Sequence, residues 1–302
     1  MNIAKVLQAI DRFQQRHAVL GMPFAVVKKY GDDQGGYQAA LITYYGFVSL
    51  FPLLLVLVTV LHLWFQNNPE LQHDVSASVG HYFPLLGDQL QRNVHSMRSA
   101  GFGLVVGVLF TLYGTRGAAD ALRFALDNMW HVPLNKRAGF PKNIAQSVGM
   151  MGCAALGFAG TVAVSAFSSA LGHALWVKIL LNIVGFAASS VVLGVIFWIA
   201  TWGRVPFKHM MVGASLAAFC FQLLLTFGGI LVARQLNHFD SVYGTFAVVL
   251  GLLFWLYLLA QIVVYAAEID TVRHQRLWPR SLTGGSLETA ADRAIRSSSK
   301  AL

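Results

Sequence analysis

Between Asn143 and Gly203 the chain carries a single charged residue, Lys178. A stretch this long and apolar fits best in a lipid bilayer, whose hydrocarbon layer is crossed by about 20 helical residues. Composition agrees, because only 12% of the 302 residues are charged, whereas soluble domains carry about 25%. The sequence therefore predicts an all-α polytopic membrane protein, and this stretch has room for two spans joined by a turn around 168–173.

Six apolar segments of spanning length predict six transmembrane helices and hence both termini on one side of the membrane. Of the 22 lysines and arginines, 18 fall in segments on that side, 3 fall on the other side, and Lys178 lies within a span. Because cytoplasmic loops are rich in Lys and Arg, we expect both termini in the cytoplasm. The predicted spans are 39–65, the first half of 101–130, two within 143–203, 210–233 and 241–267.

Three regions follow from these spans. Residues 1–38 are expected to form a cytoplasmic amphipathic segment, and residues 39–270 a six-helix transmembrane domain. Residues 271–302 are polar, Ser-rich and basic, which predicts a flexible cytoplasmic tail. A polar connection is expected at Arg234–Asp240, between the last two spans. Breaks before the first span are expected at Gly21, Pro23, Gly31, Gly35 and Gly36.

The element that organises the chain runs from Gly101 to Trp130, because its first half is apolar and its second half is charged. Arg116, Asp120, Arg123 and Asp127 are spaced 4, 3 and 4 apart. On a helix this spacing places all four on one face, with two opposite-charge pairs at i,i+4. Such a stripe can line a polar path or bind headgroups, or it can simply tie helices together at the cytoplasmic interface.

Small residues recur at every fourth position in the first span after Asn143. Such rows let helix backbones approach closely in lipid, so we expect a central, tightly packed helix rather than a lipid-facing one. The row consists of Ala145, Gly149, Cys153, Gly157, Thr161, Ser165 and Ser169.

Polar side chains inside the other spans add further candidates, because polar groups are costly in hydrocarbon and are often functional there. The last span carries a stripe at 4, 4 and 3 spacing that ends in Glu268. That glutamate can equally cap the span near water. The candidate residues for a substrate path are Tyr44, Tyr45, Arg116, Asp120, Arg123, Asp127, Gln222, Tyr257, Gln261, Tyr265 and Glu268.

Several kinds of chemistry have no motif in the sequence. It holds no phosphate-binding Gly-Lys pair, no His-x-His or His-Glu-x-x-His metal frame, and no Gly-x-Ser-x-Gly elbow. We therefore expect no enzyme activity, no cofactor and no metal. The net charge of +9 is explained by membrane topology, so no nucleic-acid partner is expected. The spacings of His73, His81, His95, Asp74 and Asp88 match no tight metal-ligand motif.

Three segments resemble the BrkB/YihY-type family of bacterial inner-membrane proteins, and within it the YhjD-like branch. The likeness extends over about residues 25–272, although Ala266 stands where many relatives have glycine. The matching segments are Ala40–Leu54 (ALITYYGFVSLFPLL), Arg123–Val132 (RFALDNMWHV), and Tyr243-Gly244 with Trp255-Leu256-Tyr257 and Ala267-Glu268.

The resemblance implies a bacterial inner-membrane location and an association with export of lipid A-type lipopolysaccharide precursors. The resemblance also implies a ribonuclease activity, because such proteins have often been labelled ribonucleases, but no motif in this sequence supports that activity. We therefore expect a transporter or flippase-like protein for an anionic amphiphile, with membrane lipids as its partners. The alternatives are a non-catalytic membrane scaffold and, least favoured, a membrane-bound ribonuclease. The residues specify neither the substrate, the energy source nor the oligomeric state.

Overall fold

The computed structural model describes residues 18–65, 101–170, 175–201, 205–243 and 246–281. Within these residues the chain forms seven α-helices and one short 3₁₀ helix and contains no strand, which confirms the all-α prediction. The elements are α2 (Ala18–Asp32), α3 (Gly35–Phe65), α6 (Gly101–Met129), η1 (Leu134–Lys136), α7 (Lys142–Ala170), α8 (Leu175–Ala200), α9 (Phe207–Tyr243) and α10 (Phe246–His274).

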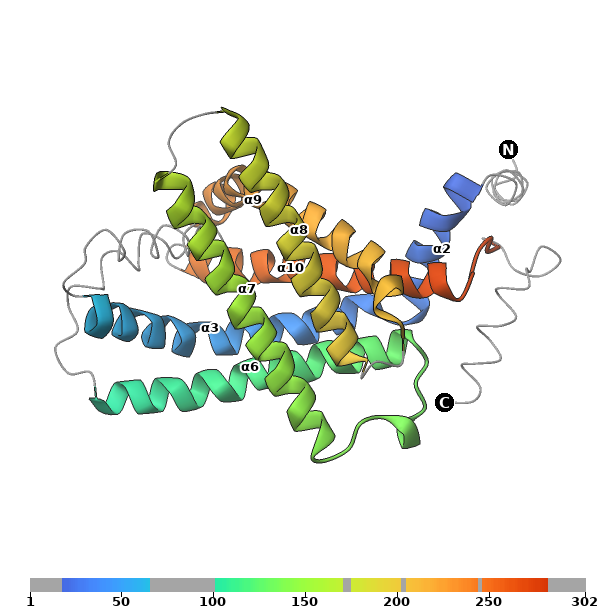
Figure 1. Cartoon of the computed structure of the whole chain (residues 1–302), viewed down its shortest axis with the longest axis horizontal. Helices are drawn as coiled ribbons and strands as arrows, with labels where there is room; N and C mark the ends of the chain where they lie inside the picture. Colours follow the sequence, from blue (N-terminus) through green and yellow to red (C-terminus); the bar gives the residue numbers. More distant parts are fainter. Residues whose placement is uncertain (1–17, 66–100, 171–174, 202–204, 244–245, 282–302) are drawn as a thin grey trace.

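Helices α3 and α6 run antiparallel and side by side along the length of the molecule, and they form its most extensive helix–helix contact (Figure 1). Helix α10 packs against α3 and α9, and α8 packs between α7 and α9. The beginning of α3, the end of α6 and the end of α10 meet at one end of the molecule, where α2 also lies (Figure 1). This end positions most of the charged residues discussed below.

Much of the outer surface is apolar, as expected for a protein that lipid surrounds. Among the described residues, three helical segments are long and apolar enough to cross a membrane: Ile179–Ala200, Phe207–Gly228 and Val249–His274. Large hydrophobic side chains are exposed along the first half of α6 and along α8. They include Val105, Leu109, Phe110, Tyr113, Trp176, Ile179, Leu180 and Ile183.

Glycine permits the close approach of α6 to α3. A Cβ atom placed on Gly114 would lie 2.7 Å from Ser49 Cα, and one on Gly117 would overlap the ring of Tyr45. Any side chain at these two positions would therefore force the helices apart. The charged half of α6 is in this way held level with the second and third turns of α3.

The small-residue row of α7 packs against α8, but the prediction that α7 is central is wrong. A Cβ on Gly157 would lie 2.8 Å from Val192, which shows how tightly that face fits. Much of the rest of the described α7 surface is open, because Val148 and Leu156, beside the row, are exposed. A small-residue row identifies one close neighbour and does not reveal how many faces of a helix are covered.

Two boundaries differ from those expected. Helix α2 continues through Gly21 and Pro23, because its apolar face packs on α10 and packing outweighs intrinsic propensity. Helix α9 continues through 234–240 to Tyr243, since that polar segment contains neither glycine nor proline. The chain turns as expected between Asp32 and Gly35.

The region expected to be a tail begins with an ordered part. Helix α10 extends to His274, and the following residues fold back so that Leu277 packs with Ala25, Val26 and Val272. The segment up to Ser281 is thus part of the folded molecule. The predicted amphipathic helix before Ala18, the loop 66–100 with its histidines, and residues 282–302 lie outside the described residues.

Candidate functional site

The charged stripe of α6 is centred on Asp120. Arg116 Nε lies 3.7 Å from one carboxylate oxygen of Asp120, as the i,i+4 spacing predicts. Arg123 Nη2 lies 3.4 Å from the other oxygen, at i,i+3. Asp127, the fourth member of the stripe, is buried, whereas Arg116 is half exposed. One carboxylate therefore lies between two guanidinium groups.

Part of this stripe holds the helices together. Ser147 Oγ, on α7, donates a hydrogen bond of 2.9 Å to Asp120, and Arg123 Nη1 donates one of 3.0 Å to the carbonyl oxygen of Ala138. The Arg123 Nε atom is buried and has no hydrogen-bond partner. Arg123 and Asp120 thus have a structural role at the α6–α7 connection, while Arg116 pairs with Asp120 and is half exposed.

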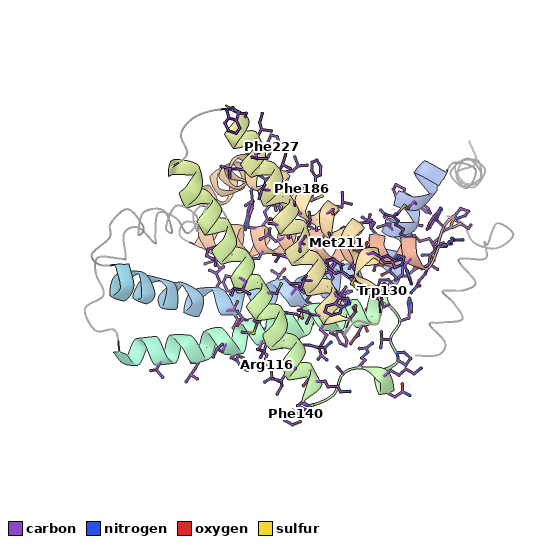
Figure 2. All side chains as sticks on the ribbon, in the orientation of Figure 1. Arg116, Trp130, Phe140, Phe186, Met211 and Phe227 are labelled. Carbon is purple, nitrogen blue, oxygen red and sulfur yellow. The ribbon has the colours of Figure 1, made fainter. Side chains whose placement is uncertain are left out.

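A groove of about 530 Å³ opens between α3 and α6, and it brings together several of the predicted residues. Arg116 lies on α6 at the edge of the molecule (Figure 2). Tyr44 makes an edge-on contact with Tyr45 at 5.2 Å between ring centroids and is exposed beside the groove. The lining residues are Leu41, Tyr45, Tyr113, Arg116, Gly117, Asp120, Ala121, Arg123 and Phe124. Cationic, aromatic and aliphatic surfaces therefore share one groove.

The polar stripe of α10 faces α2 rather than lipid. Tyr30 donates a hydrogen bond of 2.7 Å to Gln261 Oε1, and its ring stacks on Tyr265 with 4.2 Å between centroids. Burial raises the pKa of the Tyr30 hydroxyl to about 12. The Tyr257 hydroxyl lies near Gly36, at the start of α3. The α10 stripe is thus the docking face for α2 and the turn that follows it.

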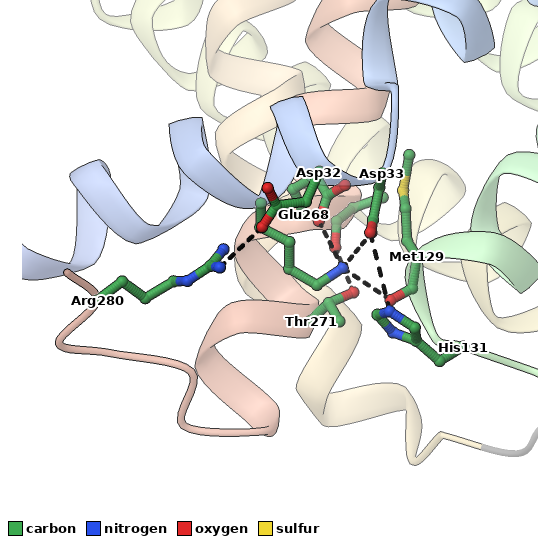
Figure 3. A network of polar contacts seen from close by, with 9 residues as sticks. Asp32, Asp33, Met129, His131, Glu268, Thr271 and Arg280 are labelled. Atoms are coloured by element: carbon green, nitrogen blue, oxygen red, sulfur yellow. Dashed lines mark hydrogen bonds and ion pairs between the residues drawn. The ribbon is translucent and has the colours of Figure 1, made fainter. Parts of the chain in front are cut away.

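At the end of this stripe, a buried lysine joins three parts of the chain. Lys29 Nζ lies 3.2 Å from Glu268 Oε2, and both side chains are 0% exposed. The same Nζ pairs with Asp33 and donates a hydrogen bond of 2.9 Å to the carbonyl oxygen of Met129. Figure 3 shows Glu268, Asp33 and Met129 converging on this point. Lys29 thus connects α2, α10 and the end of α6.

His131 borders the lysine cluster. Its Nε2 atom lies 3.9 Å from Asp33 Oδ1, on the side away from Glu268 (Figure 3). Burial and the nearby Lys29 charge lower the pKa of His131 below its ordinary value of 6.5. The imidazole is therefore mainly neutral at pH 7 and adds no positive charge to the cluster.

A second layer of contacts covers the cluster from the C-terminal side. Arg280 pairs with Asp32 at 2.7 Å, and Lys28 donates a hydrogen bond to the carbonyl oxygen of Ser281. Both contacts join α2 to the segment that follows α10. Because Asp32 is 41% exposed, this pair lies at the rim, outside the fully buried Lys29 and Glu268.

Asp270 forms a separate buried contact. Its Oδ1 accepts a hydrogen bond of 2.7 Å from the backbone N–H of Gly213, while Oδ2 is buried without a hydrogen-bond partner. A side chain at Gly213 would collide with that carboxyl group. Asp270 therefore fixes α9 to α10. Gln222, the remaining predicted residue, is exposed on α9 away from these groups.

Lys29, Asp33 and His131 were not among the residues that sequence reasoning selected. Two signals were available: Lys29 and Asp33 are spaced i,i+4, and a lone glutamate near the end of an apolar helix requires a cationic partner. Neither signal identifies which of the many lysines and arginines supplies the charge. Among the described residues no group of three His, Cys, Asp or Glu side chains is arranged to hold a metal ion.

Comparison with known proteins places the chain in a family. The family model described as "Virulence factor BrkB" matches residues 26–286, which is most of the sequence. The chain belongs to the BrkB family. The match begins within α2, continues through α10 and includes Lys29, Asp33, Arg116 and Glu268.

Curated relatives of this BrkB-family chain are named membrane proteins. It is 24% identical to a UPF0761 membrane protein of Alcanivorax borkumensis over 84% of this chain and 62% of the relative. A UPF0761 membrane protein of Vibrio vulnificus is 24% identical over 88% of this chain and 86% of the relative. The chain spans 45% of the length of a third relative, from Psychrobacter sp.. No solved structure matches.

Proposed function

We propose that this BrkB-family protein carries an anionic amphiphile, such as a lipopolysaccharide precursor, through or along the bacterial inner membrane. The observation that carries the proposal is the α3–α6 groove, where the half-exposed Arg116 stands among aromatic and aliphatic side chains. A phosphorylated lipid offers the complementary surface: an anionic headgroup for the Arg116 guanidinium group and acyl chains for the apolar wall. In this proposal the protein is not an enzyme and needs no cofactor.

The membrane arrangement that we propose has six spans, formed by α3 and α6 to α10, with both termini in the cytoplasm. The helix ends that carry most lysines and arginines lie at the same end of the molecule as α2 (Figure 1). Arg116 is then near the cytoplasmic boundary, because it lies beyond the apolar half of α6 and level with Tyr45. At this depth a headgroup can contact the groove while its chains remain in lipid.

Several contacts favour a carrier over a nuclease that binds RNA on its basic face. Arg137 donates to the Val132 carbonyl oxygen and to Asn128 and lies over the ring of Phe124. Arg123 is bound to Asp120 and to the Ala138 carbonyl oxygen. These guanidinium groups stabilise the loop between α6 and α7 and are not displayed as an open phosphate-binding surface.

The test measures binding of a diphosphorylated lipid and of a zwitterionic lipid to the full chain in nanodiscs. We expect Arg116→Gln to weaken binding of the anionic lipid roughly tenfold, since one charge-assisted contact contributes about 1.5–3 kcal/mol. Binding of the zwitterionic lipid should not change. Arg116 is the better choice than Arg123, whose loss would also disturb the α6–α7 loop.

Lys142→Gln is the matched control, because Lys142 is an exposed cation on the same predicted side and lies outside the groove. It should bind the anionic lipid as the wild type does. Equal affinities for wild type, Arg116→Gln and Lys142→Gln would contradict binding at the groove. A vesicle assay of transbilayer movement with the same variants then tests whether binding leads to transport.

A further inference from the structure

The charges around Lys29 do not balance. Two carboxyl groups, those of Asp33 and Glu268, face one ammonium group. Lys29 and Glu268 are completely buried, and the Asp33 side chain is 8% exposed. With both carboxyl groups ionised, the cluster would hold one uncompensated negative charge away from water, which costs several kcal/mol.

The Glu268 carboxyl group also lacks hydrogen bonds. Neither of its oxygens has a hydrogen-bond partner, although both are buried. A buried carboxylate normally accepts hydrogen bonds at both oxygens. The Asp33 and Glu268 carboxyl groups both contact the Lys29 ammonium nitrogen, which brings them close together. Two neighbouring buried carboxyl groups repel each other unless one of them carries a proton.

No second cation among the described residues completes the cluster. On the α6 side, His131 is mainly neutral at pH 7, as argued above. On α2, Tyr30 is neutral and Lys28 donates to the Ser281 carbonyl oxygen. From the C-terminal segment, Arg280 pairs with Asp32 at the rim. Asp270, on α10 itself, is bound to Gly213 of α9 and adds a further acid rather than a positive charge.

We infer that Lys29, Asp33 and Glu268 form a proton-binding site, in which one proton shared by the two carboxyl groups completes the charge balance. The proton comes from water and leaves to water, with His131 beside Asp33 on the exit side. When it leaves, two adjacent carboxylates face the single ammonium group across the α2–α10 junction. Proton loss therefore weakens the attachment of α2 to α10. This inference does not depend on which cargo the protein carries.

The experiment uses the full chain in nanodiscs and records infrared difference spectra between about pH 5 and about pH 9. The wild type should show the carbonyl stretch of a protonated, buried carboxyl group at neutral pH, which disappears at high pH. Glu268→Gln should lose this band and release about one proton fewer per chain over the same range. Asp32→Asn is the matched control, because Asp32 lies on α2 at the rim, and it should keep the band.

Thermal unfolding provides a second measurement, because the inference predicts the direction in which stability changes with pH. If the folded cluster holds a proton that the unfolded chain releases at neutral pH, stability falls as the pH rises until the proton has left. We expect this fall for the wild type and for Asp32→Asn, and a flatter profile for Glu268→Gln. Asp33→Asn removes the other carboxyl group of the pair and should also lose the band, so it tests the inference if Glu268→Gln folds poorly. Asp270→Asn removes the separate buried carboxyl group and should keep the band.

Two results would overturn the inference. One is a wild-type spectrum without a protonated carboxyl band at neutral pH. The other is a wild-type stability that depends on sodium concentration at fixed pH while no such band is present, because a bound cation would then supply the missing charge.

Discussion

At the scale of single residues, Lys29 has the largest structural role in the described part of the chain. It is a completely buried cation that contacts Asp33, Glu268 and the Met129 carbonyl oxygen. Breaking a buried ion pair by removing one partner is costly, because the other charge remains buried without compensation. Loss of this side chain would therefore leave two buried acids without their cation at the α2–α10 junction, beside the apolar contacts of Ala25 and Val272.

Replacing Lys29 by methionine should lower the free energy of unfolding by about 3–5 kcal/mol, because Glu268 and Asp33 would lose their only described cation. The double variant Lys29→Met, Glu268→Leu should recover part of this loss, since it removes the stranded acid as well. Thermal unfolding in detergent measures both changes. Lys142→Met, an exposed substitution, serves as the control. A Lys29→Met midpoint equal to that of the control would show that the pair is not stabilising.

Sequence reasoning found one half of this cluster and missed the other half. Glu268 was selected because an acid in an apolar helix is unusual in its own sequence context. Lys29 and Asp33 lie among ordinary surface-type residues, and periodicity describes neighbours on one helix only. Contacts between α2 and α10 join positions as far apart as Tyr30 and Gln261, separated by 231 residues. No local pattern identifies such partners.

At the scale of helices, the contact between α3 and α6 depends on glycine at one point. Gly114 faces the backbone of Ser49, with 2.7 Å between an added Cβ and Ser49 Cα. Backbone cannot move aside as a flexible side chain can. The helices were predictable from long apolar runs, whereas this contact was not, because the same spans also contain glycines with open space around an added Cβ, such as Gly46, Gly152 and Gly185.

We expect Gly114→Ala to destabilise the protein by about 1–3 kcal/mol, the usual cost of overpacking a tight contact. Gly46→Ala, on α3, is the matched control, because nothing lies within 4 Å of an added Cβ there. It should be neutral or slightly stabilising, since alanine favours helix. Unfolding midpoints of the two variants provide the comparison. Similar losses for both would indicate that the helices are not in close contact at Gly114.

At the scale of the whole molecule, the lopsided distribution of lysine and arginine was the strongest prediction from sequence, and it concerns the membrane rather than the fold. The described helices alternate in direction so that the loop containing η1 lies at the same end as α2 (Figure 1). Hydropathy does not predict which helix lies at the edge or which part of the C-terminal region is folded, because both depend on packing between helices.

Cysteine labelling tests the orientation directly. Lys136→Cys lies on η1 and is exposed, and we expect a membrane-impermeant thiol reagent to label it only from the cytoplasmic side. The two native cysteines, Cys153 and Cys220, are first replaced by alanine. Labelling of intact cells without permeabilisation would place the loop in the periplasm and would reverse the proposed topology.

The contacts of α2 have a consequence for biogenesis. Tyr30 on this helix leaves the ribosome 231 residues before Gln261, its hydrogen-bond partner on α10. Until α10 has been inserted, Lys29 has no route to Glu268 and remains hydrated at the membrane surface. Insertion of α10 therefore completes the attachment of α2, and a chain interrupted before α10 leaves α2 without its binding partner.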